Sequence, residues 1–202
     1  EFIDCTSNKI DEEKSERFTE ALNKEGFDYP AKGVYGNPTT RKAFDEGYFI
    51  VDNSDQIFHL KMIKGEPFCK NIHAPSGFKV KYMNIAEQVL REFYGVVISD
   101  DNLFYFISYN NYQIKEVPVN GYDPKNTTLV FRGDVYFRSI QLTNDDSLVV
   151  LMMDRDYKVF DRYVEPLQNV KKMDVGVVEA YLFPFTISQQ SPSSFFIGLY
   201  FS

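Results

Sequence analysis

Residues 48–61 read Tyr-Phe-Ile-Val-Asp-Asn-Ser-Asp-Gln-Ile-Phe-His-Leu-Lys, which is an apolar run, a polar turn and a second apolar run. Apolar segments of this length on either side of a cluster of Asp, Asn and Ser predict a β-hairpin. The pattern returns when Asp101, Asp146 and Pro192 are aligned with Asp55, in steps of 46, 45 and 46 residues. The chain is therefore predicted to repeat one hairpin.

A third apolar segment follows the first three hairpins at the same spacing, at residues 66–70, 112–116 and 157–161. A period of about 40–50 residues with several short strands in each unit is typical of propeller blades. Regularly spaced strands also occur in β-sandwiches, where the alignment would be a coincidence. We expect an all-β, propeller-like array of about four antiparallel units of 45–46 residues, with a short N-terminal helix.

Each of the first three units is expected to end in a fourth strand, at residues 78–83, at 129–132 and near Val170. The fourth unit keeps two predicted strands, residues 177–187 and 194–201. Two outcomes remain open: residues 27–46 add a closing strand to a ring, or the units form an open array.

The N-terminal part, residues 1–46, is predicted as a helix and a connector, and residues 47–202 as the propeller-like domain, together one compact unit. Residues 11–24 combine a narrow apolar stripe with an acidic first turn, and Gly26 is placed to end the helix. Residues 27–46 are rich in Pro, Gly and Asn, which indicates turns. One or two helical turns are also expected between residues 84 and 91.

Composition narrows the classes of partner. The 202 residues carry a net charge of −7 and no cluster of Lys and Arg, so we expect no nucleic-acid partner. Aromatic residues make up 16% of the chain, which suits strands. The longest apolar runs, 148–153 and 195–201, are too short to span a bilayer as helices, so any membrane anchor is expected outside these residues.

The two histidines are the natural candidates for acid, base or metal-ligand chemistry. His59 lies on a predicted strand at the position that Tyr105 and Val150 occupy in other units, which favours a packed side chain. His73 precedes Ala-Pro-Ser-Gly, where an exposed loop residue is expected. Neither histidine is assigned a catalytic role from the sequence.

Acidic residues supply two further alternatives. A ring of turn aspartates could bind calcium, but Asp and Asn also favour tight turns for local reasons, and we prefer that interpretation. The turn aspartates are Asp52, Asp55, Asp100, Asp101, Asp145 and Asp146. Paired acids could serve glycoside hydrolysis, and the glutamates Glu46, Glu87, Glu92 and Glu165 stay unranked for it. No catalytic residue, metal site or cofactor is predicted.

The cysteines, Cys5 and Cys69, permit one disulfide or two free thiols. Their spacing matches no zinc or redox motif. Spacing alone carries no geometry for a disulfide, so free, partly buried thiols are the preferred interpretation.

The run from Gly36 to Asp52, continued by residues 58–62 and 91–95, resembles an uncharacterised bacterial family, a domain of unknown function. The resemblance covers most of residues 30–165. It implies membrane-anchored proteins with a propeller-like extracytoplasmic domain, hence a periplasmic or cell-envelope location. It implies no activity and no site residue.

From these observations we expect a non-catalytic binding or protein-interaction domain, the extracytoplasmic part of a membrane-associated protein, whose partner is an unidentified protein or small molecule. Loops that repeated units expose on one face suit recognition. The alternative is a carbohydrate- or peptide-directed hydrolase or lyase with a site of carboxylates and His, in which His59 and several acids would converge in one pocket. A cytoplasmic location is the alternative to the cell envelope.

Overall fold

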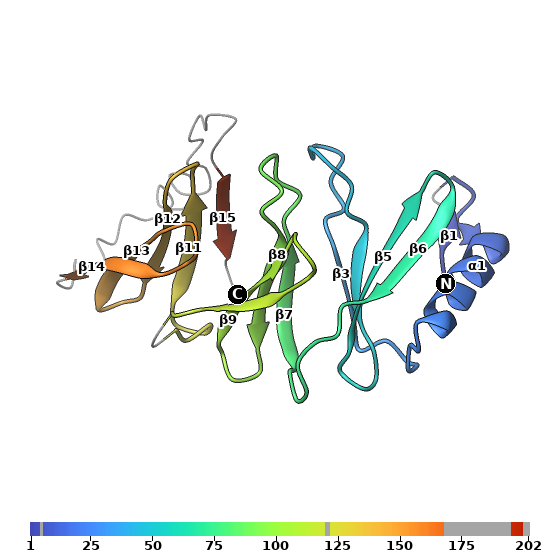
Figure 1. Ribbon diagram of the computed structural model, residues 1–202, viewed down its shortest axis with the longest axis horizontal. Helices are drawn as coiled ribbons and strands as arrows, with labels where there is room; N and C mark the ends of the chain where they lie inside the picture. Colours follow the sequence, from blue (N-terminus) through green and yellow to red (C-terminus); the bar gives the residue numbers. More distant parts are fainter. Residues whose placement is uncertain (5, 120–121, 168–194, 200–202) are drawn as a thin grey trace, which may run out of the picture. The chain divides into compact units, whose positions relative to one another are not determined.

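The computed structural model describes residues 1–4, 6–119, 122–167 and 195–199, which form an all-β protein with one helix (Figure 1). The chain divides into two compact units, Glu1–Glu116 and Val117–Ser202. The all-β prediction is confirmed for the described residues.

The first unit begins with a two-stranded ribbon, β1 (Ile3–Asp4) and β2 (Lys9–Ile10), followed by helix α1 (Glu12–Lys24). The side chain of Asp11 caps the helix by accepting a hydrogen bond from the backbone N of Lys14 at 3.0 Å. The predicted helix is therefore confirmed, and Asp11, the first residue of the predicted range, is its N-cap. It has 13 residues, and no helix in the described part of the chain is long and apolar enough to cross a membrane.

The first sheet has the order β3-β4-β5-β6. Its strands are β3 (Gly33–Gly36), β4 (Tyr48–Val51), β5 (Ile57–Ile63) and β6 (Glu66–Asn71). The β4–β5 hairpin is the one predicted from residues 48–61. β3 lies inside the predicted connector and pairs antiparallel with β4, so the connector contributes the first strand of this sheet.

The second sheet has the order β10-β9-β8-β7. Its strands are β7 (Val80–Ile85), β8 (Phe93–Ser99), β9 (Phe104–Ser108) and β10 (Ile114–Val117). The strand predicted at 78–83 as the last of unit one is β7, the first strand of this second sheet, paired with β8. Spacing along the chain fixes the period of a repeat but not the strand with which each unit begins.

The segment between β7 and β8 is a loop, so the predicted helical turns between residues 84 and 91 are wrong. The prediction rested on the spacing of Ile85, Val89 and Leu90. Ile85 is buried at the end of β7, whereas Val89 and Leu90 are exposed to solvent, so the three share no packed face. Two residues of the site described below, Glu87 and Arg91, come from this loop.

The first unit has one core between its two sheets and another beneath the helix. The first core joins Phe49, Val51 and Ile57 of the first sheet to Met83, Ile85, Val97 and Ile107 of the second. The second core packs Phe18 and Leu22 of α1 against Phe58 and Leu60 of β5. Successive residues of β5 thus enter opposite cores, as the two-residue side-chain period of a strand requires.

The second unit is one sheet with the order β14-β13-β12-β11-β15. Its strands are β11 (Thr128–Gly133), β12 (Arg138–Thr143), β13 (Ser147–Met153), β14 (Val159–Pro166) and β15 (Phe195–Leu199). The strand predicted at 129–132 to end unit two is β11, which begins this sheet. β15 lies within the range predicted as the second strand of a fourth unit, residues 194–201, but its backbone pairs antiparallel with β11 and so belongs to this sheet. The strands predicted near Val170 and at 177–187 lie outside the described residues.

The repeat itself is confirmed in the described residues. The second strands of the three sheets, β4, β8 and β12, begin at Tyr48, Phe93 and Arg138, in two steps of 45 residues. The hairpin turns predicted by the alignment of Asp55, Asp101 and Asp146 join the second and third strands of each sheet. The described part of the chain therefore holds three repeated sheets, where about four units were expected.

Candidate functional site

The buried carboxylate of Glu46, just before β4, is the centre of a polar network in the first unit. Its Oε1 accepts a hydrogen bond from Nη2 of Arg91 at 2.7 Å and one from the hydroxyl of Tyr109 at 3.2 Å. Its Oε2 accepts from Nζ of Lys61 on β5 at 2.9 Å. Two cations and a phenol therefore surround one carboxylate that is only 3% exposed.

A second buried carboxylate, Glu87, lies beside the first. Its Oε1 accepts from the backbone N of Glu46 at 2.7 Å and from Nζ of Lys42 at 3.0 Å. Lys42 also donates to Oδ1 of Asp45 at 3.0 Å. Burial disfavours the Lys42 ammonium, but its hydrogen bonds to Glu87 and Asp45 outweigh that effect and raise its pKa. The same hydrogen bond from Lys42 lowers the pKa of Asp45.

The imidazole of His59 is fully buried between two hydrogen-bond partners. Its Nε2 lies 2.5 Å from the carbonyl oxygen of Glu46, and its Nδ1 lies 2.8 Å from the hydroxyl of Tyr112. A carbonyl only accepts, so the hydrogen is assigned to Nε2, and Nδ1 accepts from Tyr112. Burial lowers the pKa of His59 to about 4, which keeps the ring neutral near pH 7.

Aromatic rings complete the network. The Tyr94 ring is stacked between those of Tyr109 and Tyr112, with ring centroids 4.4 and 4.8 Å apart. The Arg91 guanidinium lies 4.5 Å from the centroid of Tyr109, and burial raises the pKa of Tyr112. Tyr112 and Arg91 adopt the left-handed backbone conformation, with φ of 56° and 46°. That conformation costs about 1 kcal/mol or more in a bulky residue, so the surrounding contacts must hold both in place.

The polar network, as we call it, joins the two sheets of the first unit. Its members are Lys42, Asp45, Glu46, His59, Lys61, Glu87, Arg91, Tyr94, Tyr109 and Tyr112. Glu46, His59 and Lys61 belong to the first sheet or the loop before its β4, and Arg91, Tyr109 and Tyr112 to loops of the second. Its three carboxylates match its three lysine and arginine cations in number. The network therefore carries no net charge, and its hydrogen bonds and ion pairs hold the two sheets together.

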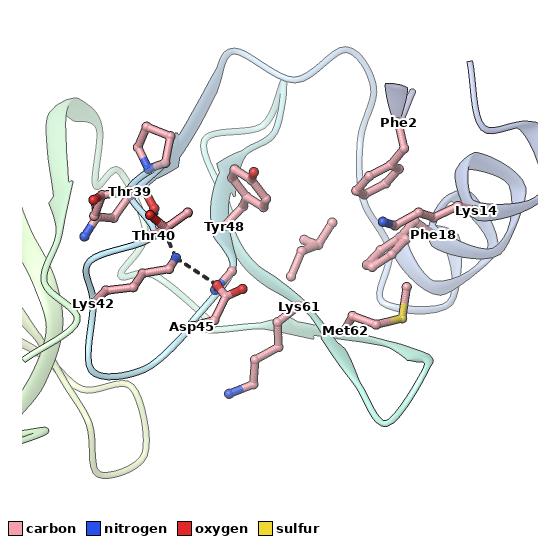
Figure 2. A pocket seen from close by; sticks show the side chains of 14 residues that line it. Phe2, Lys14, Phe18, Thr39, Thr40, Lys42, Asp45, Tyr48, Lys61 and Met62 are labelled. Atoms are coloured by element: carbon pink, nitrogen blue, oxygen red, sulfur yellow. Dashed lines mark hydrogen bonds and ion pairs between the residues drawn. The ribbon is translucent and has the colours of Figure 1, made fainter. Parts of the chain in front are cut away.

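A pocket of about 610 Å³ opens beside this network, and we call it the α1 pocket (Figure 2). Figure 2 shows Phe2, Lys14, Phe18 and Met62 at one end, Thr39, Thr40, Lys42 and Asp45 at the other, and Tyr48 between them. The remaining lining residues are Asn37, Pro38, Gly47, Leu60 and Lys61. Lys42, Asp45 and Lys61 belong to both the pocket and the polar network.

The wall of the pocket requires glycine at position 47. Gly47 has φ of 69°, and a Cβ there would collide with the carbonyl oxygen of Leu60. The chain can therefore turn from Glu46 into β4 while lying directly against β5.

The structure brings three of the candidates, His59, Glu46 and Glu87, into one cluster and disperses the others. His73 is an exposed loop residue, as predicted. Glu92 lies just before β8 in the first unit, whereas Glu165 is on β14 in the second, where it accepts from Tyr163 at 3.2 Å.

Among the turn aspartates, the side chain of Asp52 bonds the backbone of its own turn. Oδ1 of Asp52 accepts from the backbone N of Ser54 at 2.9 Å and of Gln56 at 2.8 Å, whereas Asp55 pairs with Lys32 at 2.6 Å. Asp100 and Asp101 occupy the β8–β9 turn, and Asp145 and Asp146 the β12–β13 turn. Across the described ranges, no group of three or more His, Cys, Asp or Glu side chains could hold a metal ion.

Cys69 of β6 is half-buried, and burial raises the pKa of its thiol to about 12. Cys5 lies outside the described residues, so the disulfide alternative is not addressed. A thiol with so high a pKa is a poor nucleophile, because the thiolate is the reactive form.

Sequence reasoning missed Lys42, Lys61, Arg91, Tyr109 and Tyr112. Lys61 stands between Leu60 and Met62 on β5, where a lysine in an apolar strand was a usable signal of a buried partner. The others lie in loops, and no local pattern links them to Glu46.

The fold and the network define a repetitive all-β domain with an N-terminal helix and a network of ion pairs between two sheets. The chain belongs to the family described as Domain of unknown function (DUF4857), which matches residues 1–153. Comparison with curated proteins and with solved structures gives no match. The predicted resemblance to an uncharacterised domain is thereby confirmed.

Proposed function

We propose that this protein is a non-catalytic binding domain whose ligand occupies the α1 pocket. The observation that carries the proposal is the bonding of His59. Both ring nitrogens have internal partners, Tyr112 and the carbonyl of Glu46, and the ring is 0% exposed. A general base must come within hydrogen-bond reach of a substrate proton, and a ring held in this way does not.

The alternative, a hydrolase or lyase, is favoured by one observation. His59, Glu46 and Glu87 do converge, as the expectation for an enzyme required. Convergence alone does not make a catalytic site, because both oxygens of Glu46 already accept hydrogen bonds from protein donors. None of the three side chains, Glu46, Glu87 and His59, lines the pocket.

The α1 pocket supports ligand binding by its size and its lining. Pockets for small molecules are commonly about 300–1,000 Å³, with apolar walls and a few polar groups that orient the ligand. At about 610 Å³, with Phe2, Phe18 and Met62 facing Thr39 and Thr40, the α1 pocket fits that description.

The finer architecture and location are part of the same proposal. Successive sheets with a 45-residue period support a propeller-like array. The resemblance carried by residues 36–52 supports a bacterial, membrane-anchored protein whose domain lies in the periplasm or cell envelope. The net charge of −7 supports a partner other than nucleic acid.

A thermal-shift screen of small molecules against the wild type and two tryptophan variants tests the binding function. Met62→Trp fills the pocket, whereas Ile63→Trp places the same ring at the neighbouring exposed position of β5, outside the lining. We expect compounds that raise the melting temperature of the wild type and of Ile63→Trp but not of Met62→Trp. Hydrolysis of a glycoside or peptide that is lost in a folded Glu46→Gln variant would contradict the proposal.

A further inference from the structure

We infer that the α1 pocket selects an amphiphile with one negative charge, a carboxylate attached to an apolar chain or ring, and that Lys14 holds the carboxylate. This inference rests on the proposed binding function and assigns the chemistry of its ligand. It draws on three features of the pocket: its charges, the position of Lys14 and its apolar lining residues.

The pocket has one cation that the protein does not neutralise. Four charged residues line it: Lys14, Lys42, Asp45 and Lys61. Lys42 pairs with Asp45 and Glu87, and Lys61 pairs with Glu46. Lys14 makes no ion pair within the described ranges. In a protein with a net charge of −7, a pocket with one free positive charge is suited to a single anionic group.

Lys14 is placed to use that charge inside the pocket. It lies in the first turn of α1, and its Nζ is 5.3 Å from the centroid of the Phe2 ring. The Phe2 ring in turn lies 4.4 Å from that of Phe18, and Figure 2 shows the three side chains together at the helix end. Next to apolar rings, an ion pair is less screened than in open water, so one ammonium can discriminate between ligand charges.

The rest of the pocket specifies the remainder of the ligand. From Lys14, the lining continues over Phe18 and Met62 to Tyr48. Leu60 also lines the pocket. This surface can cover a hydrocarbon chain or a ring, which is the main source of affinity for an apolar group. The hydroxyls of Thr39 and Thr40 at the far end suit a neutral polar group or water.

Isothermal titration with decanoate, at concentrations below those at which it forms micelles, tests the assignment. Decyltrimethylammonium provides the same chain with the opposite charge. Lys14→Met keeps the length of the side chain and removes its charge, and Lys24→Met makes the same change at an exposed position of α1 outside this pocket. Because Lys14 is near the positive end of the helix dipole, its neutralisation should not unfold α1.

We expect decanoate to bind the wild type and Lys24→Met equally, and Lys14→Met about fivefold or more weakly, as for the loss of one partly screened ion pair. The cationic amphiphile should bind about tenfold more weakly than decanoate. Met62→Trp should abolish binding of both. Vesicles of phosphatidylglycerol, whose anion is a phosphodiester, separate the two kinds of anion. Sedimentation that depends on Lys14 would assign the site to a membrane phospholipid and overturn the carboxylate assignment, whereas decanoate binding without sedimentation supports a free carboxylate.

Two further results would overturn the inference while the binding function stands. One is equal affinity for the two amphiphiles, unchanged in Lys14→Met but lost in Met62→Trp, because the pocket then binds apolar chains without regard to charge. The other is no binding of decanoate when the thermal-shift screen finds ligands that depend on Met62. If no compound of any charge depends on Met62, both the inference and the binding function fail.

Discussion

Glu46 shows how one buried charge decides the structure around it. Its carboxylate accepts from Lys61, Arg91 and Tyr109, and its own carbonyl oxygen fixes the tautomer of His59. Removing this carboxylate would leave two cations without a counter-charge. The resulting loss of stability is larger than the net contribution of the intact ion pairs, because an uncompensated charge in a partly buried site is costly.

Glu46→Gln should therefore lower the free energy of unfolding by about 3 kcal/mol. The matched control is Glu66→Gln, which removes a 2.7 Å ion pair with Arg17 where the Glu66 side chain is 79% exposed. That control should lose about 0.5 kcal/mol or less, because solvent screens exposed pairs. Urea unfolding of the three proteins measures both values. Equal losses in the two variants would show that the polar network adds nothing beyond surface electrostatics.

At the scale of residues, the sequence predicts burial better than it predicts partners. The alignment of His59 with Tyr105 and Val150 of the other units was enough to predict a packed side chain. It was not enough to place Tyr112 beside it, because the two residues are 53 positions apart and meet only when the sheets pack. The same holds for Arg91, which is 45 positions from Glu46 in sequence. Arg91 lies in a loop for which the spacing of apolar residues had wrongly predicted helical turns.

Helix α1 protects the outer edge of the first sheet. Arg17 donates to the carbonyl oxygen of Gly65 at 3.0 Å, just before β6, and the backbone N of Asn71 donates to Glu25 at 3.0 Å. An uncovered edge strand presents unpaired backbone groups that invite association with another chain. Phe18 anchors the helix, since it is buried against Phe58 and Leu60.

Phe18→Ala should cost about 3 kcal/mol of stability and speed hydrogen exchange at the β6 amides, because the helix loses its main apolar contact. Glu20→Ala changes an exposed position of the same helix and should stay within about 0.5 kcal/mol of the wild type. Hydrogen exchange followed by mass spectrometry over residues 66–71 measures the effect. Unchanged protection of β6 in Phe18→Ala would mean that the helix does not guard this edge.

At the scale of elements, the sequence predicts strands well and their assignment to sheets less well. The hairpins and third strands of three units are confirmed, because turn residues and apolar runs are local signals. The strands at 78–83 and 129–132 were assigned to the preceding sheet, although each begins the next one. Hydrogen-bond partners decide that assignment, and a period counted along the chain is the same for either choice.

The whole molecule combines a net charge of −7 with a buried polar network that has no net charge. The surface charges and the buried network respond differently to acid. Surface carboxylates lose charge gradually as the pH falls. His59 responds over a defined range, because burial holds its pKa in the folded protein at about 4, below the ordinary value of 6.5. Between these two values the unfolded chain binds a proton at this position that the folded protein excludes.

Stability should therefore fall as the pH is lowered from about 6.5 to about 4, and His59 should account for roughly 3 kcal/mol of the loss, because one pKa unit corresponds to about 1.4 kcal/mol. The sign follows from proton uptake: wherever the unfolded state binds more protons, stability rises with pH. Urea unfolding at intervals from pH 4.5 to 7.5 measures the slope. His59→Gln, although less stable at pH 7, should lose this part of the slope, whereas His73→Gln, at an exposed loop position, should keep it. A wild-type slope that survives in His59→Gln would assign the acid sensitivity to the carboxylates and leave His59 with no part in it.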